Sequence, residues 1–383
     1  MRGSIIKRGK TYSAVVDLPK DPVSGKRRRK WFSGFKTKKE AERELAFRIT
    51  EIEKGTFAEL STSTITEYLQ KWFEVHKVNL SPSTFRRYKG IIDYKLIPSL
   101  GSIKLKDIKP FHIQEFITKE LSGGRKDNKK SVGKALDPAT VSYECRVLHK
   151  ALQQAVEWEI ISRNPADSIQ LPRVQREEVN IISESEVTKL LENIKALYIY
   201  VPVYLAIYTG MRLGEVLGLR WQDVDLENKI IKVNRSNCQV KVGEPLFKEP
   251  KTRKSKRTID ISDSVTCLLR QNKAEQEKWK LDAKEAWQDY DLVCCHKDGI
   301  PINPPNLSSY FKDVAKRLGL NVTFHGLRHT HASLLIKAQV PLKVISERLG
   351  HSTFAVTMDI YSHVLPGMQT EAANKLEELL KNS

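Results

Sequence analysis

The segment His325-Gly-Leu-Arg-His-Thr330, followed by Leu349-Gly-His351 and by Tyr361, decides which fold and chemistry this chain is expected to have. Far upstream, Arg212 stands in the run Thr209-Gly-Met-Arg-Leu-Gly-Glu215. Together these segments supply two arginines, two imidazoles and a phenol, a set that suits a phosphodiester. The fork of a guanidinium matches the non-bridging oxygens of a phosphate. A phenol can attack phosphorus and form a covalent ester.

A zinc site is the first alternative for this segment, because histidines at 325 and 329 would share one face of a helix. The zinc-protease helix needs a glutamate directly after its first histidine, and this chain has Gly326 there. Arg328 would also be repelled by a dication. A phosphate tolerates both residue types, since an Arg and a His one turn apart can point at one anion. The sequence therefore predicts no metal site and no cofactor.

The composition is that of a basic, folded protein of two or three domains. The 383 residues are 40% hydrophobic and carry a formal net charge of +19. Such an excess favours a polyanionic partner, most commonly nucleic acid, over an unrelated basic protein. No apolar run approaches the roughly 20 residues that span a bilayer. Without a signal-peptide pattern either, we expect a cytoplasmic protein associated with the nucleoid.

The five cysteines are scattered along the chain, and none forms a CxxC pair. The adjacent Cys294 and Cys295 follow apolar residues and are expected in a buried strand. Reduced structural thiols are therefore favoured over disulfides or zinc ligands.

The N-terminal residues are strongly basic and alternate like strands. Residues 1–39 hold 13 Lys and Arg against two Asp. Residues 12–18 and 27–33 are expected as strands joined by a turn at 21–25, and a capping box at Thr37 should begin a helix that ends near Gly55. A basic sheet backed by one helix can enter a DNA groove; a solvated basic hairpin is the alternative. The candidate DNA contacts here are Arg27, Arg28, Arg29 and Lys30.

Residues 62–170 are expected to be a compact helical domain. Caps or cap-plus-proline pairs at Thr64, Ser81 and Asp137 predict helix starts, and Pro98 with Gly101 should end the second helix. That second helix carries cations on one face and aromatic residues on the other. Its candidate DNA contacts are Arg86 and Arg87. Residues 171–179 are expected to be a linker.

Residues 180–383 are expected to be helices around a small antiparallel sheet, with strands at 230–233, 238–242 and 257–261. The chain as a whole is thus predicted to be multidomain and mainly α. Arg212 should lie near a helix N-terminus, where Glu215 can hold its guanidinium. A surface ion pair is the alternative for these two residues.

The pattern Arg-Leu-Gly-Glu, His-x-Leu-Arg-His-Thr, Leu-Gly-His-Ser and a Tyr ten residues after that His resembles the tyrosine recombinases. It is similar in particular to integrases of phages and conjugative transposons. The resemblance implies an arm-type DNA-binding domain at 1–58, with a three-stranded sheet plus a helix, and a helical core-binding domain at 62–170. It further implies a linker at 171–179 and a catalytic domain at 180–383.

The same resemblance implies a site-specific recombinase that integrates and excises a mobile element without metal or ATP. Tyr361 would form a 3′-phosphotyrosine and release a 5′-hydroxyl. Arg212, Arg328 and His351 would hold the non-bridging oxygens. His325 would accept the tyrosine proton or donate a hydrogen bond. Lys251, in a basic turn between two strands, would be the general acid, and the neighbouring Lys254 and Lys256 are the alternatives. Beside Lys251, Lys254 would contact DNA.

The resemblance also implies partners. These are double-stranded DNA at core and arm attachment sites, a homotetramer on that DNA, and an excisionase or a host DNA-bending protein. A helix expected at 371–381 would pass to a neighbouring protomer or dock on its own domain. A type IB topoisomerase, a chromosome-dimer resolvase and a DNA-binding regulator with an inactive site are the alternative roles.

Overall fold

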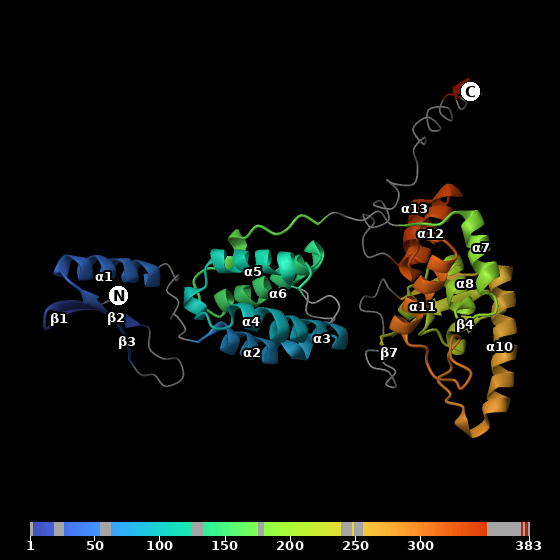
Figure 1. The fold of residues 1–383 in the computed structure, drawn as a ribbon, viewed down its shortest axis with the longest axis horizontal. Helices are drawn as coiled ribbons and strands as arrows, with labels where there is room; N and C mark the ends of the chain where they lie inside the picture. Colours follow the sequence, from blue (N-terminus) through green and yellow to red (C-terminus); the bar gives the residue numbers. More distant parts are fainter. Residues whose placement is uncertain are drawn as a thin grey trace. The chain divides into compact units, whose positions relative to one another are not determined.

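The structure is a computed structural model (Figure 1). It describes residues 3–18, 27–53, 63–124, 133–174, 180–238, 247–248, 256–350, 377 and 380–381. The chain divides into two compact units, Met1–Arg176 and Glu177–Ser383, and each is described by itself. No helix in the described ranges is long and apolar enough to cross a bilayer.

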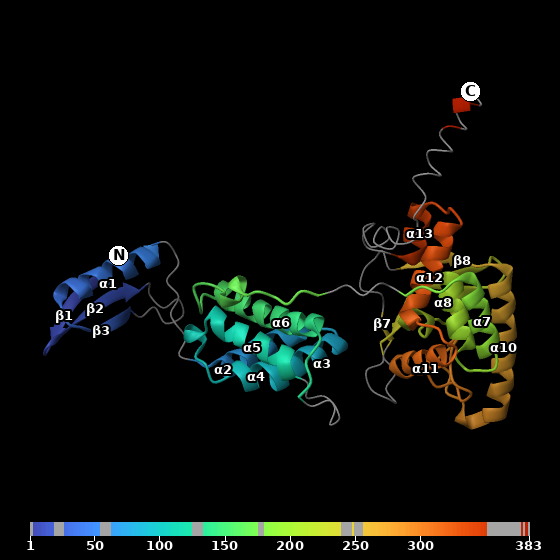
Figure 2. The ribbon, with the colours of Figure 1, turned by 45° about the horizontal axis from the view of Figure 1, so that its top comes forward.

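The first unit begins with a three-stranded antiparallel sheet that has one helix along one face (Figures 1 and 2). Its elements are β1 (Gly3–Arg8), β2 (Thr11–Leu18), β3 (Arg28–Phe35) and α1 (Lys38–Glu53). The predicted capping box is present, because the Glu40 amide donates to Thr37 Oγ1 at 3.2 Å and Glu40 Oε2 accepts from the Thr37 amide at 3.3 Å. The turn predicted at 21–25 lies outside the described residues.

The remainder of the first unit is helical and has an apolar core that includes Trp72 and Leu148. Its helices are α2 (Ile65–His76), η1 (Lys77–Asn79), α3 (Pro82–Ile91), the π-helical η2 (Ile92–Leu96), α4 (Ile97–Leu100), η3 (Leu105–Asp107), α5 (Pro110–Gly123), α6 (Pro138–Glu157) and η4 (Pro165–Ser168). The caps predicted at Thr64, Ser81 and Asp137 are all present.

The prediction that Pro98 and Gly101 end the second helix is confirmed for Gly101 and was wrong for Pro98. The chain continues from α3 through η2 into α4, and Pro98 lies in the first turn of α4. The π-helical segment shifts the hydrogen-bond ladder, so that the Ile97 amide donates to the Ile92 carbonyl. A proline is tolerated in the first turn of a helix because backbone N–H groups there have no acceptor within the helix, so the N–H that proline lacks costs no hydrogen bond. The helix therefore ends only at Gly101.

The second unit surrounds two small antiparallel sheets with helices (Figures 1 and 2). Its elements are α7 (Glu184–Ile194), α8 (Tyr200–Thr209), α9 (Leu213–Val216), η5 (Trp221–Asp223), β4 (Val224–Asp225), β5 (Ile230–Val233), β6 (Ser236–Asn237), β7 (Phe247–Lys248), β8 (Arg257–Asp260), α10 (Asp263–Ala283), η7 (Lys284–Ala286), α11 (Pro304–Arg317), α12 (Phe324–Lys337) and α13 (Leu342–Leu349).

The expectation of one sheet was too simple. β4, β5 and β8 form one sheet, whereas β6 and β7 pair separately. The chain leaves the first sheet after Val233, where Asn234 Nδ2 donates to Asp223 Oδ1 at 2.9 Å and Arg235 Nε donates to the Gly218 carbonyl at 2.7 Å. Of the strand predicted at 238–242, Cys238 is not in a strand, and 239–242 lie outside the described residues.

The strand predicted at Cys294 and Cys295 was also wrong. Both residues are buried, but only isolated bridges at Leu292 and Cys295 occur there. All five cysteines lie in the described ranges, and all are free thiols.

Candidate active site

Arg212 and Arg328 approach the same helix end, although they lie far apart in the sequence. Arg328, on α12, donates through Nη2 to the Leu349 carbonyl at 2.6 Å. Arg212 Nη2 donates to the next carbonyl, that of Gly350, at 3.5 Å. These carbonyls end α13, where helix geometry leaves acceptors free and the dipole favours cations.

Gly210 makes this approach possible. Arg328 Nη1 donates to the Gly210 carbonyl at 2.6 Å. Gly210 ends α8 in the left-handed conformation, with φ of 66°. A Cβ there would lie 2.6 Å from both His331 Cδ2 and Leu349 Cδ2. The glycine in Thr-Gly-Met-Arg therefore lets α8 end directly against α12 and α13.

Glu215 fixes the orientation of Arg212, as the sequence predicted. Its Oε1 accepts from Arg212 Nη1 at 2.8 Å, and its Oε2 accepts from the Arg212 amide at 2.9 Å. Its Oε2 also accepts from Arg257 Nη2 at 2.8 Å. Burial would raise the pKa of Glu215, but the bonds and charges of Arg257 and Arg212 hold that pKa below its ordinary value. The carboxylate is therefore ionised at neutral pH.

The cluster carries an excess of positive charge, and its groups are buried except for the partly exposed Arg212. It holds three guanidinium groups, those of Arg212, Arg257 and Arg328, and one carboxylate, that of Glu215. Burial, with the charges of Arg212 and Arg257, lowers the pKa of Arg328 to about 9. Buried charge is costly unless it is compensated. An anion such as a phosphodiester would supply the compensating charge.

His325 lies one turn before Arg328 on α12, with its side chain exposed. Its ring meets that of His329 edge to face, with centroids 4.9 Å apart. Desolvation, Arg328 and Arg212 lower the pKa of His325. It is therefore a neutral imidazole at pH 7, which can accept a proton or donate a hydrogen bond.

Gly326, which argued against zinc, has a packing reason of its own. A Cβ at this position would lie 2.9 Å from the Asn180 carbonyl oxygen and 2.9 Å from Val322 Cγ2. A glutamate would therefore not fit without displacing the start of the second unit.

Of the predicted catalytic residues, the structure brings Arg212, His325 and Arg328 together. Lys251, His351 and Tyr361 lie outside the described residues, as does Lys254. In the sequence, the segment 249–255 separates β7 from β8, and His351 directly follows Gly350.

His331 has structural contacts that join three helices. Its Nδ1 lies 2.7 Å from the Ile207 carbonyl, and its Nε2 accepts from Arg348 Nε at 3.3 Å. Burial and Arg348 lower its pKa to about 4, so the ring is neutral and ties α12 to α8 and α13.

Comparisons with known proteins match this architecture along the chain. Residues 180–367 match the phage integrase family, 64–121 match the phage integrase N-terminal SAM-like domain, and 4–52 match an arm DNA-binding domain. A tyrosine recombinase XerC-like protein of Caldanaerobacter subterraneus subsp. tengcongensis is 32% identical, and the match covers 98% of each chain. The chain is a tyrosine recombinase of the phage integrase family. It is therefore a site-specific recombinase, an enzyme that breaks and rejoins DNA strands.

Solved structures share the fold of this recombinase. The Tn1549 transposon integrase in complex with transposon right-end DNA superposes with a TM-score of 0.68 and 19% identity, covering 83% of this chain and 99% of that one. The lambda integrase tetramer bound to a Holliday junction has a TM-score of 0.56 and 17% identity, with 92% of each chain covered.

The sequence placed Arg257 at the start of a predicted strand but indicated no role for its side chain. Strand alternation was the available signal. Within β8, Arg257 and the buried Ile259 share one face, which points inward, whereas Thr258 and Asp260 are exposed. Arg257 therefore belongs to the buried cluster of the recombinase.

Because side chains alternate along β3, the basic residues at its start point to both faces of the sheet. Arg29 pairs with Asp17 at 2.8 Å on the face away from α1. Arg28 and Lys30 share the opposite face with Phe32. The guanidinium of Arg48 on α1 lies 4.8 Å from the ring centroid of Phe32, so this face is the one toward α1. The four candidates Arg27–Lys30 therefore do not form one contact surface.

The face of this sheet away from α1 contains a pair that the sequence did not reveal. The guanidinium of Arg8 lies 4.5 Å from the ring centroid of Trp31, and Trp31 is 41% exposed. A cation held over an exposed indole keeps its donors available at the surface. Arg8 therefore joins Arg29 as a candidate DNA contact.

α3 has the two faces that the sequence predicted. Arg86 and Arg87 are exposed, whereas Phe85 and Tyr88 pack against the helical core. The Arg87 guanidinium lies 3.6 Å from the ring centroid of Tyr143, which restrains its direction.

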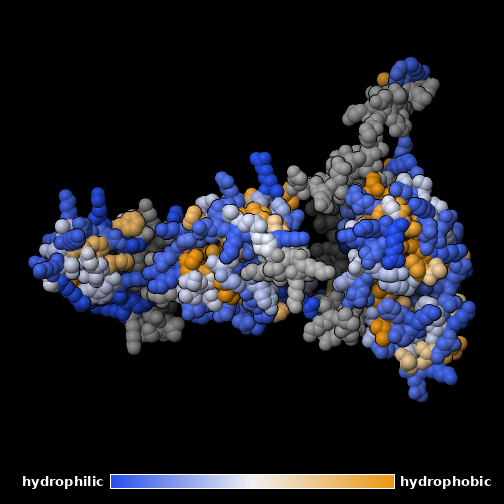
Figure 3. Space-filling model, in the orientation of Figure 1, coloured by the Kyte–Doolittle hydropathy of each residue, from blue (hydrophilic) through white to orange (hydrophobic). Residues whose placement is uncertain are grey.

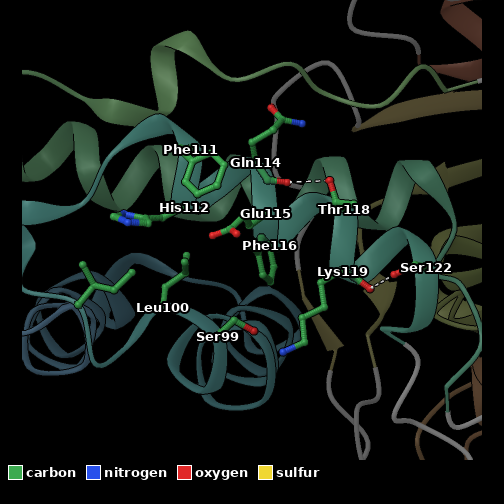
Figure 4. Close-up of a pocket in the computed structure, with 11 residues that line it drawn as sticks. Ser99, Leu100, Phe111, His112, Gln114, Glu115, Phe116, Thr118, Lys119 and Ser122 are labelled. Carbon is green, nitrogen blue, oxygen red and sulfur yellow. Dashed lines mark hydrogen bonds between the residues drawn. The ribbon is translucent and has the colours of Figure 1, made fainter.

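A pocket beside α5 lies apart from these candidates (Figure 4). Its lining includes Phe111, Glu115 and Lys119, and none of its residues is a predicted site residue.

In the space-filling view, hydrophilic residues dominate the surface of each part, with smaller apolar patches between them (Figure 3).

Proposed function

We propose that this recombinase cleaves DNA by attack of Tyr361 on a backbone phosphate. The attack forms a bond from the phenolic oxygen to phosphorus and breaks the bond from phosphorus to the 5′-oxygen. The products are a 3′-phosphotyrosine and a 5′-hydroxyl. Because the ester keeps the energy of the phosphodiester, attack by a new 5′-hydroxyl can religate the strand without ATP.

The observation that carries this proposal is the convergence of Arg212 and Arg328 on successive carbonyls at the end of α13. Guanidinium groups fixed before the substrate arrives can stabilise the additional negative charge of the transition state. His351, the next residue in the sequence after Gly350, is proposed to bind the same phosphate. His325 is proposed to take the phenolic proton, for which its lowered pKa leaves a neutral nitrogen.

Lys251 is proposed to protonate the leaving 5′-oxygen. An alkoxide is a poor leaving group, so a positioned acid accelerates its departure. The segment that carries Lys251 joins β7 to β8, and β8 begins with Arg257 of the buried cluster. Lys254 is proposed to contact DNA.

The three sequence blocks are proposed to have separate tasks. Residues 1–58 bind arm-type sites, through Arg8 and Arg29 of the sheet face away from α1. Residues 62–170 bind the core site, with Arg86 and Arg87 of α3 at the phosphates. Residues 180–383 perform the cleavage, and 171–179 connect them. The matches to arm, SAM-like and integrase domains support this division.

The proposed partners are duplex DNA at core and arm sites and three further copies of this chain. The lambda integrase tetramer on a Holliday junction supports this assembly. The similarity to a transposon integrase supports a role in integrating and excising a mobile element. An excisionase or a DNA-bending protein would set the direction, and the nucleoid would be the place of action.

The proposal is tested with nicked duplexes made from the DNA that flanks the gene. The wild type should give a protein–DNA adduct that survives detergent, and Tyr361→Phe should give none. Tyr310→Phe is the matched control, because Tyr310 packs on Tyr198 with ring centroids 5.2 Å apart and should leave the adduct intact. No adduct with the wild type on any flanking duplex would refute the proposal.

A further inference from the structure

We infer that Arg257 is a positioning residue of the recombinase, which holds Glu215, and through it Arg212, against the C-terminal end of α13. The inference rests on the proposed role of Arg212 as a phosphate ligand. It assigns a task to a residue in the run Ser255-Lys-Arg-Thr258 that the cleavage mechanism above does not use.

Three successive carbonyls at the end of α13 receive three different arginines. Arg257 Nε donates to the Arg348 carbonyl at 2.7 Å. Arg328 donates to the Leu349 carbonyl at 2.6 Å, and Arg212 donates to the Gly350 carbonyl at 3.5 Å. The helix end therefore sets the spacing of all three guanidinium groups, and Arg257 lies first in the row.

Arg257 also joins this row to Glu215. One guanidinium donates through Nε to the Arg348 carbonyl and through Nη2 to Glu215 Oε2. The side chains of Arg257 and Glu215 are 5% and 6% exposed, so this ion pair is shielded from water. A lysine in place of Arg257 keeps the charge but cannot reach both acceptors in the same fixed directions.

Gly350 has the geometry that this contact requires. A Cβ on Gly350 would lie 3.0 Å from Arg257 Cδ, and its φ of 64° is left-handed. The end of α13 at Gly350 therefore lies close against the Arg257 side chain. Arg257 thus contacts the end of α13 and Glu215, and in the sequence it follows the segment that carries Lys251.

Replacing Arg257 should disturb the orientation of Arg212 in the reaction but should remove no contact with DNA. Without the Arg257 bond, Glu215 keeps only Arg212 as an ion-pair partner in the cluster and can rotate with it. A displacement of about 1 Å in a catalytic group can slow a reaction by about 100-fold.

Arg348 offers a matched control on the same helix. It donates to the carbonyls of Asp260 at 2.9 Å and Tyr208 at 3.1 Å, and to His331. Its side-chain hydrogen bonds in the described ranges go to neither Glu215 nor Arg212. Arg348→Lys therefore tests what loosening of α13 does by itself.

The experiment measures single-turnover cleavage of two nicked suicide duplexes by the full chain. One duplex carries the normal scissile phosphate, and the other carries a methylphosphonate, which lacks the negative charge that Arg212 neutralises. Arg257→Lys should cleave the normal duplex about 10- to 100-fold more slowly than the wild type. On the methylphosphonate its deficit should be several-fold smaller, while duplex affinity should stay within about twofold of the wild type.

Because Arg348→Lys leaves the ion pair of Arg257 with Glu215 intact, its deficit should differ between the two duplexes by less than that of Arg257→Lys. Glu215→Gln, which is isosteric, should reproduce the Arg257→Lys signature and serves if Arg257→Lys does not fold. Equal deficits of Arg257→Lys and Glu215→Gln on both duplexes, or cleavage at the wild-type rate, would overturn the inference. Failure of the wild type to cleave would instead count against the proposed function.

Discussion

Gly210→Ala provides a quantitative test of how the arginines are held. Its methyl group would lie 2.6 Å from His331 Cδ2 and from Leu349 Cδ2, and its φ is 66°. The left-handed backbone costs an alanine about 1–2 kcal/mol. Overpacking adds about 1–3 kcal/mol. The displaced carbonyl is the acceptor for Arg328 Nη1, so cleavage should fall as well.

Gly319→Ala separates the two contributions. Gly319 has φ of 75°, and a Cβ there would meet nothing within 4 Å. It should therefore show only the backbone cost of about 1–2 kcal/mol. The two variants should differ in the free energy of unfolding by the overpacking cost, about 1–3 kcal/mol.

Amide hydrogen exchange is the appropriate assay, because a chain of several domains does not unfold in two states. Peptides that cover α8 and α12 should exchange about 5- to 140-fold faster in Gly210→Ala than in Gly319→Ala, since 1.4 kcal/mol is a factor of ten. Equal exchange in the two variants would refute the close approach of α8 to α12 and α13.

Three further predictions concern the chemistry and the DNA contacts. Lys251→Ala should cleave slowly on normal DNA but recover on a duplex with a 5′-bridging sulfur, because a thiolate leaves without a proton; Lys254→Ala should behave as the wild type in cleavage on both duplexes. Because the pKa of His325 is lowered, its imidazole stays neutral at a pH below about 6.5, the ordinary pKa of histidine. The single-turnover cleavage rate should therefore stay constant as the pH falls through 6.5 and decline only at lower pH. A decline in that rate centred at or above pH 6.5 would contradict this. Arg29→Ala should weaken binding to arm-site duplexes and reduce the salt dependence more than Lys30→Ala, which lies on the face toward α1, and equal losses in filter-binding titrations would count against the assignment of faces.

Features of the fold that depend on one or two neighbouring side chains could be predicted from the sequence. The capping boxes at Thr37 and Thr64 satisfy amides within one turn, so their position in the sequence is enough. Pro98 was misjudged because a π-helical segment upstream shifted the ladder, and no local signal marks that shift. The second sheet escaped prediction because Asn234 and Arg235 redirect the chain through partners distant in sequence.

The candidate site divides in the same way. Arg212 and Arg328 were predicted through a resemblance that fixes order and spacing, and Glu215 followed from its place one turn after Arg212. Arg257 was missed, because its acceptors are Glu215 and a backbone carbonyl of α13, and only the tertiary fold brings these together. In the first sheet, the charge of residues 27–30 was evident, but the side of the sheet that each faces required the pairing register.

The central claim is that Tyr361 becomes covalently bound to DNA at a phosphate held by Arg212 and Arg328. The most direct measurement is tandem mass spectrometry of the adduct after nuclease and protease digestion, with analysis of the free DNA end. We predict a peptide in which Tyr361 carries a 3′-phosphonucleotide, and a released strand with a 5′-hydroxyl. An adduct on another residue, or a 5′-phosphate on the released strand, would contradict this mechanism.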